Sequence, residues 1–273
     1  MDIDDAKNPT EAGLIGDRQI DALLDQVPRE LGIQELRRAI DRQQLLLYYQ
    51  PKVSSRDGRI VGVEALIRWN HPTRGLIQPS DFIPLLEESG LILEVGSWVL
   101  EQAAEDFCAW TAKGLAPLRI AVNVSPIQLK HRNFIDDLAK AQHINSPGHA
   151  GIDIEITEGV IVDDLDDCIR KLSAVRELGV QVAIDDFGTG YSSLRYLAKL
   201  PIDALKIDRS FVSMVTETPN DLAIVSAIIV LAHGLNLDVV AEGVERGTQI
   251  ADWALAGHYD LQAPSNKVAI GAH

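Results

Sequence analysis

Val180-Gln181-Val182-Ala183-Ile184-Asp185-Asp186 is the stretch that decides the fold, because a short β-branched run ends there in two aspartates. It follows a helix-length amphipathic segment at 164–178, and Gly179 separates the two. A short apolar run beside a helix-length segment is typical of a βα unit in a mostly parallel sheet. The stretch therefore predicts a buried strand whose end carries two carboxylates.

The same alternation of short apolar runs and helix-length segments recurs along the chain. Strands are predicted at Leu45–Tyr49, Ile60–Leu66, Leu118–Val124, Ile152–Thr157, Gln181–Asp186, Ala204–Asp208, Val239–Val244 and His258–Gln262. Helices are predicted from Ile33 to the first strand and at Trp98–Lys113, Asp164–Leu178, Asp221–His233 and Thr248–Leu255, with Gly114, Gly179 and Gly234 as left-handed caps. Eight strands in roughly 220 residues fit an α/β fold of the modified TIM (β/α)8 type. An open doubly wound sheet is the alternative, although no Gly-rich dinucleotide-binding turn follows the first strands.

Composition limits the classes of partner. The chain has 273 residues, 25 basic and 40 acidic, and its net charge of −15 argues against binding a nucleic acid polymer. Two cysteines and an acidic N-terminus without a secretion signal suggest a cytoplasmic protein. No apolar run approaches the roughly 20 residues that span a bilayer, so no membrane contact is expected from this chain. Residues 1–30 are predicted to be a linker or N-terminal arm, and 31–273 one domain.

Polar side chains end six successive predicted strands. They are Glu64, Asn123, Glu155, the pair Asp185 and Asp186, Lys206 with Asp208 after it, and Glu242. In a parallel barrel these ends share one rim, so the side chains are expected to converge. Clustered carboxylates repel unless cations neutralise them, and oxygen ligands without clustered His or Cys suit Mg²⁺ or Mn²⁺. The pattern predicts two ions, with the aspartate pair as bridging ligands.

These residues stand in segments that resemble the EAL-domain cyclic di-GMP phosphodiesterases, a bacterial signalling family. The resemblance covers roughly 45–262. The segments are Tyr49-Gln50-Pro51, Val63-Glu64-Ala65-Leu66-Ile67-Arg68-Trp69, Asn123-Val124-Ser125, Glu155-Ile156-Thr157-Glu158, Asp185-Asp186-Phe187-Gly188-Thr189-Gly190-Tyr191-Ser192-Ser193-Leu194, Leu205-Lys206-Ile207-Asp208 and Ala241-Glu242-Gly243-Val244-Glu245. The resemblance implies hydrolysis of one phosphodiester bond of cyclic di-GMP to linear pGpG by a water that two metal ions activate.

The resemblance also implies a role for each matching residue. Metal ligands would be Glu64, Asn123, Glu155, Asp185, Asp186 and Glu242. Catalytic residues would be Glu242 as general base, Lys206 beside the attacking water, and Asp186. Substrate contacts would be Gln50, Leu66, Arg68 and Gln262, while Glu158 would steady the loop after Asp186. The domain at 31–273 would then be an EAL phosphodiesterase domain that forms a homodimer, with a sensory or GGDEF-type domain upstream of it.

The C-terminal end departs from the family pattern. Tyr259 stands where the family has aspartate, and Pro264 follows two residues after Gln262. Proline cannot donate a ladder hydrogen bond, so the last barrel strand is expected to be irregular or incomplete. The alternative function is a catalytically weak or inactive EAL domain that acts as a cyclic di-GMP receptor. A purely structural barrel is the weakest interpretation, because it leaves the acidic rim unexplained.

Overall fold

The computed structural model describes most of the chain between Arg29 and Glu242. The described residues are 29–55, 57–115, 119–144, 151–161, 164–189, 194–214, 219–243, 260–262 and 270–271. The N-terminal arm predicted at 1–30 lies outside the described residues except for its last two positions. The helix predicted at Thr248–Leu255 lies wholly outside them.

Eight strands form a closed ring, because β1 pairs with both β2 and β9, which confirms the modified TIM barrel and excludes the open sheet. The ring contains β1 (Leu45–Ser54), β2 (Ile60–His71), β4 (Arg119–Val124), β5 (Ile152–Thr157), β6 (Val182–Phe187), β7 (Ala204–Ile207), β8 (Asp238–Glu242) and β9 (Asp260–Gln262). The ring strands β2, β4, β5, β6, β7, β8 and β9 run parallel in chain order, and β9 pairs with β1 to close the ring. The closing strand has only three residues, in line with the irregular C-terminal end that the sequence predicts.

Strand β1 is antiparallel to both of its neighbours in the ring. It pairs with β2 as a long hairpin, and Gly58 in the connecting turn has a left-handed φ of 70°. The strand continues to Ser54, five residues past its predicted end at Tyr49. Two short strands extend the sheet, namely β3 (Gly75–Ile77) beside β2 and β10 (Ile270–Gly271) beside β1. The reversal of β1 means that its C-terminal half lies with the N-terminal ends of the parallel strands.

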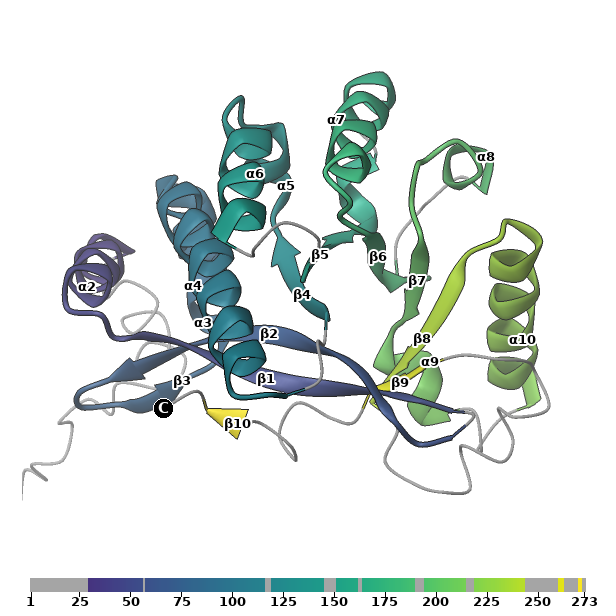
Figure 1. Ribbon diagram of the computed structural model, residues 1–273, viewed down its shortest axis with the longest axis horizontal. Coiled ribbons are helices and arrows are strands. Elements are labelled where there is room, and N and C mark those ends of the chain that lie inside the picture. The colour runs from purple at the N-terminus through teal and green to yellow at the C-terminus, as the bar shows by residue number, and fades with distance from the viewer. Residues whose placement is uncertain are drawn as a thin grey trace, which may run out of the picture.

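The helices stand outside the ring (Figure 1) and cover its outward-facing side chains. Helical elements are α2 (Arg29–Asp41), α3 (Pro79–Ser89), α4 (Ile92–Ala112), α5 (Pro126–Lys130), α6 (Phe134–Ile144), the 3-10 helix η1 (Glu158–Ile161), α7 (Leu165–Glu177), α8 (Leu194–Leu197), α9 (Arg209–Met214) and α10 (Pro219–Gly234). Ile154 and Ile156 of β5 are fully buried in the layer between strands and helices. None of the helices in the described part of the chain is long and apolar enough to cross a bilayer.

Two of the three predicted glycine caps are confirmed and one is wrong. Gly114 and Gly179 follow α4 and α7 with φ values of 74° and 77°. Gly234 is instead the last residue of α10, and the left-handed position after that helix belongs to Asn236, with φ 60°. Asparagine tolerates this conformation better than most residues, so the chain turns two residues later than glycine placement predicts.

Candidate active site

The candidate active site lies inside the barrel, where alternate strand residues point. On β5 the two isoleucines face the helices, so Glu155 between them faces the interior. Glu64 on β2 and Lys206 on β7 also point inward, since their side chains meet there. Residues that are 142 positions apart in sequence thus come into contact. The convergence at one rim that the strand ends predict is therefore present in the structure.

Lys206 lies at the centre of the acidic group. The side chain is 1% exposed, and its Nζ lies 3.1 Å from Oε2 of Glu64, 2.5 Å from Oε2 of Glu155, 3.1 Å from Oδ1 of Asp185 and 2.7 Å from Oε1 of Glu242. Burial alone would lower the pKa of this ammonium, but the four carboxylates outweigh burial and raise the pKa well above its usual value. Lys206 is therefore positively charged throughout the physiological range.

The carboxylate oxygens form two groups that can each hold a divalent cation. Glu64, Glu155 and Asp185 make the first group, and Asp185, Asp186 and Glu242 the second, with ligand oxygens in each within 4.8 Å of one another. Asp185 belongs to both groups, which is the arrangement expected of a ligand shared by two ions. Within the described residues, these five carboxylates meet the ammonium groups of Lys206 and Lys52, and the charge of Arg68 acts on Glu64. Uncompensated negative charge and oxygen-only ligands fit Mg²⁺ or Mn²⁺.

A bulge in β6 directs the side chains of Asp185 and Asp186 toward the same group of oxygens. Consecutive strand residues normally point to opposite faces, but the β6–β7 register shifts between Ile184 and Phe187. Asp186 also has a left-handed φ of 53°, and its backbone N–H donates to Oδ1 of Asp185 at 2.9 Å. Such a conformation is costly for a residue with a Cβ and is often found at functional sites.

Asn123 and Glu158 lie at the edges of the acidic group. Asn123 donates from Nδ2 to Oε1 of Glu64 at 2.6 Å, which places its amide beside the first group of oxygens. Glu158 is buried in η1, and its Oε2 accepts a hydrogen bond from the backbone N–H of Gly188 at 3.1 Å. This bond connects η1 to the loop that follows Asp186. Glu158 therefore contacts the loop that the resemblance expects it to steady.

The residues expected to contact substrate are placed less uniformly. Gln50 is buried and pairs with Glu64 across the β1–β2 ladder. Leu66 lines an apolar cavity of about 540 Å³ that α3 and α4 flank. Arg68 is buried, and its Nη1 donates to the carbonyl of Ile67 at 2.8 Å. Gln262 is described only by its backbone, which pairs with Glu242 of β8 and Lys52 of β1.

One residue of this site, Lys52, is absent from the residues that the sequence analysis names, and another, Asp208, is named there only as following Lys206. Lys52 donates from Nζ to Oε1 of Glu155 at 2.5 Å, and it lies two positions after Gln50 on the same face of β1. Asp208 is hydrogen bonded to the Asp186 side chain, and it follows Lys206 by two positions. The period of two along β1 would have found Lys52, had the predicted strand been extended past Tyr49.

Burial raises the pKa of several carboxyl groups in the cluster. This holds for Glu155, Asp185 and Asp186, and for Glu242 the pKa rises to about 8. Neighbouring carboxylates raise these pKa values further, while Lys206 opposes the shift. The metal-free cluster therefore keeps protons that the unfolded chain has already lost at neutral pH.

We expect the metal-free chain to lose stability as pH rises from about 4.5 toward 8. The folded state binds more protons than the unfolded state in this window, so the free energy of unfolding falls as pH increases, by an amount on the order of a few kcal/mol. Thermal unfolding in EDTA and in excess Mg²⁺ measures this directly. Mg²⁺ competes with the protons and should flatten or reverse the slope. A melting temperature in EDTA that rises steadily through the window would contradict the proposed protonation.

Comparison with known proteins places this geometry in a family. The EAL domain family model matches residues 33–261. The chain is 46% identical over 219 residues to the bifunctional diguanylate cyclase/cyclic di-GMP phosphodiesterase MucR of Pseudomonas aeruginosa, covering 80% of this chain and 32% of that protein. It is 43% identical over 230 residues to the cyclic di-GMP phosphodiesterase NbdA of the same organism, covering 84% of this chain and 29% of that protein.

A solved structure of the PaMucR phosphodiesterase in a c-di-GMP complex has the same fold. Its TM-score is 0.81 at 42% identity, and the match covers 87% of this chain and 99% of that one. The chain spans about a third of the length of the curated relatives it matches. The match of the family model to most of the chain, together with these identities, shows that the chain belongs to the EAL domain family.

Proposed function

We propose that this chain hydrolyses one phosphodiester bond of cyclic di-GMP to give linear pGpG. The observation that carries the proposal is the pair of three-carboxylate groups that share Asp185 at the mouth of the barrel. The names of MucR and NbdA, and the c-di-GMP complex of PaMucR, identify the substrate class among relatives. In the reaction, water oxygen bonds to phosphorus, the P–O3′ bond breaks, and the 3′ oxygen leaves with a proton.

Two divalent cations, held by Glu64, Asn123, Glu155, Asp185, Asp186 and Glu242, would lower the pKa of the attacking water and neutralise charge on the phosphate. The residues of the chain do the rest. Lys206 stays protonated, so it orients the attacking water and the carboxylates electrostatically and does not serve as a base. Arg68 grips a phosphate oxygen, and Gln50, Leu66 and Gln262 position the nucleotide. Glu158 holds the loop that carries Asp186.

Glu242 has the properties of the proton acceptor. Its side chain is 20% exposed at the barrel mouth, and its pKa of about 8 lies near physiological pH. Divalent cations in the neighbouring oxygen groups would lower this pKa and favour the ionised carboxylate, which is the form that accepts a proton from water. Asp186 of β6 lies in the same oxygen group as Glu242 and assists by fixing the position of the water.

The direct test is to incubate the purified chain with cyclic di-GMP and Mg²⁺ or Mn²⁺ and to separate the products by chromatography. Formation of pGpG that stops when EDTA is added supports the proposal. Tight binding of cyclic di-GMP without any product would instead favour a receptor and would overturn the hydrolytic function.

Replacing Glu242 with glutamine should lower kcat by at least about 100-fold while cyclic di-GMP binding stays measurable. The amide keeps the size of the side chain and one oxygen ligand but cannot accept the proton. Stopped assays for kcat and calorimetry for binding separate the two effects. Equal loss of turnover and binding would show that Glu242 acts only in holding the ligand.

We also propose a homodimer and an upstream sensory or GGDEF-type domain. Leu194 and Tyr196 of α8 are 58% and 43% exposed just beyond the loop that follows Asp186, which offers an apolar contact surface. MucR, which this chain matches over part of its length, is named as both a diguanylate cyclase and a phosphodiesterase. Sedimentation of the chain, and of a Leu194→Asp variant, tests the dimer.

A further inference from the structure

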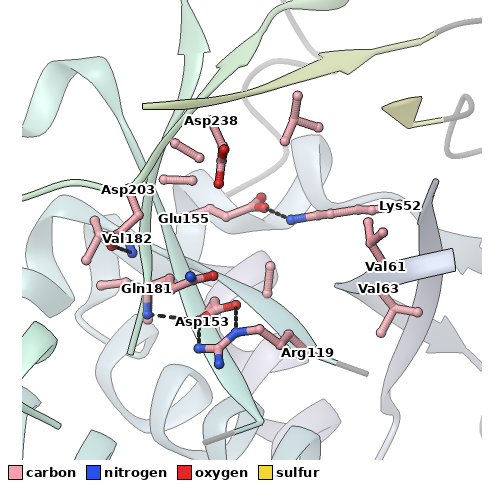
Figure 2. A pocket seen from close by; sticks show the side chains of 16 residues that line it. Lys52, Val61, Val63, Arg119, Asp153, Glu155, Gln181, Val182, Asp203 and Asp238 are labelled. Atoms are coloured by element: carbon pink, nitrogen blue, oxygen red, sulfur yellow. Dashed lines mark hydrogen bonds and ion pairs between the residues drawn. The ribbon is translucent and has the colours of Figure 1, made fainter. Parts of the chain in front are cut away.

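The barrel contains a cavity of about 140 Å³ below the acidic group, on the side of the N-terminal strand ends (Figure 2). TIM-type barrels usually fill this level with bulky branched side chains. Here the inward-facing positions carry small residues instead. They are Gly62 of β2, Ala121 of β4, Ala183 of β6 and Ala204 of β7. The barrel is therefore hollow directly beneath Glu155. The other polar side chains that line this level are mostly hydrogen bonded to groups of the lining itself.

Lys52 reaches into this cavity because β1 is antiparallel. Its backbone pairs with Gly62 on one side and Gln262 on the other, and a register shift follows directly after it. A bulge changes the direction in which the side chain of the residue beside it points, compared with a regular strand. The side chain is 14% exposed, and Figure 2 shows it pointing across the cavity toward Glu155. The ammonium therefore approaches Glu155 from the side of the N-terminal strand ends.

The two oxygens of Glu155 have different partners. Oε1 accepts from Lys52 on the cavity side at 2.5 Å. Oε2 accepts from Lys206 at 2.5 Å, and the same ammonium contacts Glu64 and Asp185, the other members of the first group. The Glu155 side chain is fully buried, which shields both oxygens from bulk solvent. A carboxylate held in this way by one oxygen presents the other in a fixed direction. Arg119 and Asp153, which also line the cavity, are bonded to each other, with Arg119 Nε donating to Oδ2 at 2.6 Å, and Asp153 Oδ1 also accepts from the backbone N–H of Gln181.

We infer that Lys52 is a positioning residue that holds Glu155 from beneath and aims its second oxygen at the metal ions. The inference rests on the proposed function of the site, since it concerns a ligand of the proposed ions. Partners of this kind typically change metal affinity or activity by about 10–100-fold when they are removed. The cavity also makes a rescue experiment possible. When Lys52 is removed, a small ammonium ion from solution has room to occupy the place of the lysine head group beside the same oxygen.

The test is Mn²⁺ binding by the whole chain, measured by electron paramagnetic resonance. Lys52→Met and Lys52→Ala should each weaken Mn²⁺ binding by about 10–100-fold. Ethylammonium should restore most of the lost affinity in Lys52→Ala, whereas tetramethylammonium, which lacks N–H donors, should not. Lys171→Met is the matched control, since Lys171 of α7 carries the same charge but donates to the carbonyl of Leu129 outside the barrel. It should bind Mn²⁺ as the unmodified chain does.

Either of two results would overturn the inference. One is Mn²⁺ affinity unchanged in both Lys52 variants, and the other is a loss that ethylammonium does not restore, which would make Lys52 a packing residue. If Lys52→Ala folds only when ethylammonium is present, the inference is supported, and failure to fold even then contradicts it. Mn²⁺ binding does not depend on turnover. A chain that binds Mn²⁺ but yields no pGpG therefore counts against the proposed function and not against this role.

Discussion

Replacement of Lys206 with methionine is expected to destabilise the metal-free chain by about 3–5 kcal/mol near pH 8. Methionine fills a similar volume, so the loss is electrostatic. Four carboxylates that each lie within 3.1 Å of the ammonium would be left without their shared cation. Near pH 5 the difference should shrink, because burial already keeps several of these groups protonated there.

Urea unfolding at both pH values, in EDTA and in excess Mg²⁺, measures the effect. Mg²⁺ should recover part of the stability at pH 8, since divalent cations replace the missing positive charge. Turnover should fall by at least about 100-fold even with Mg²⁺, because the water loses its orienting charge. Lys140→Met, on the exposed side of α6, is the control and should change neither quantity. A Lys206→Met chain as stable as the unmodified one in EDTA at pH 8 would show that the cluster does not need this lysine.

The second large effect is expected at Asp185, the carboxylate common to both oxygen groups. Asp185→Asn should remove measurable turnover, a loss of at least about 1,000-fold or about 4 kcal/mol of transition-state stabilisation. The amide removes the charge that both ions share, so each site loses an anionic ligand. Substitution of any other residue in the two groups affects one ion directly and the second only through the first.

Calorimetric titration with Mn²⁺ distinguishes this prediction from a general loss of structure. The unmodified chain should bind two Mn²⁺ ions, and Asp185→Asn should bind at most one, with reduced affinity. Asp166→Asn, at an exposed position at the start of α7, changes the same charge away from the site and should retain both ions. Two ions bound by Asp185→Asn with ordinary affinity would refute the sharing of this ligand.

The strand ends could be predicted from sequence because burial imposes a strict period on them. In β5 the fully buried Ile154 and Ile156 flank Glu155, and such an alternation admits only one placement of the carboxylate. The same reasoning located Glu64 and Glu242 on the correct strands. The aspartate pair is different, since simple alternation would separate the two side chains, and only the bulge at β6 brings them together.

Other features depend on contacts that the local sequence does not reveal. The short elements β3, α5, α8 and α9 bury too few side chains to give a clear period. Lys52 sits in the second half of β1, where Pro51 and the half-buried residues after it obscure the strand pattern. The positioning role of Lys52 depends on the antiparallel direction of β1 and on small residues of four other strands. Both become visible only when the strands are closed into a ring.

Anomalous diffraction from a crystal of the chain with Mn²⁺ tests the central claim most directly. We expect two manganese peaks at the mouth of the barrel, one contacting Glu64, Glu155 and Asp185 and the other contacting Asp185, Asp186 and Glu242. Anomalous maps that show no manganese among these oxygens, with Lys206 still bonded to all four carboxylates at saturating Mn²⁺, would contradict the two-metal account.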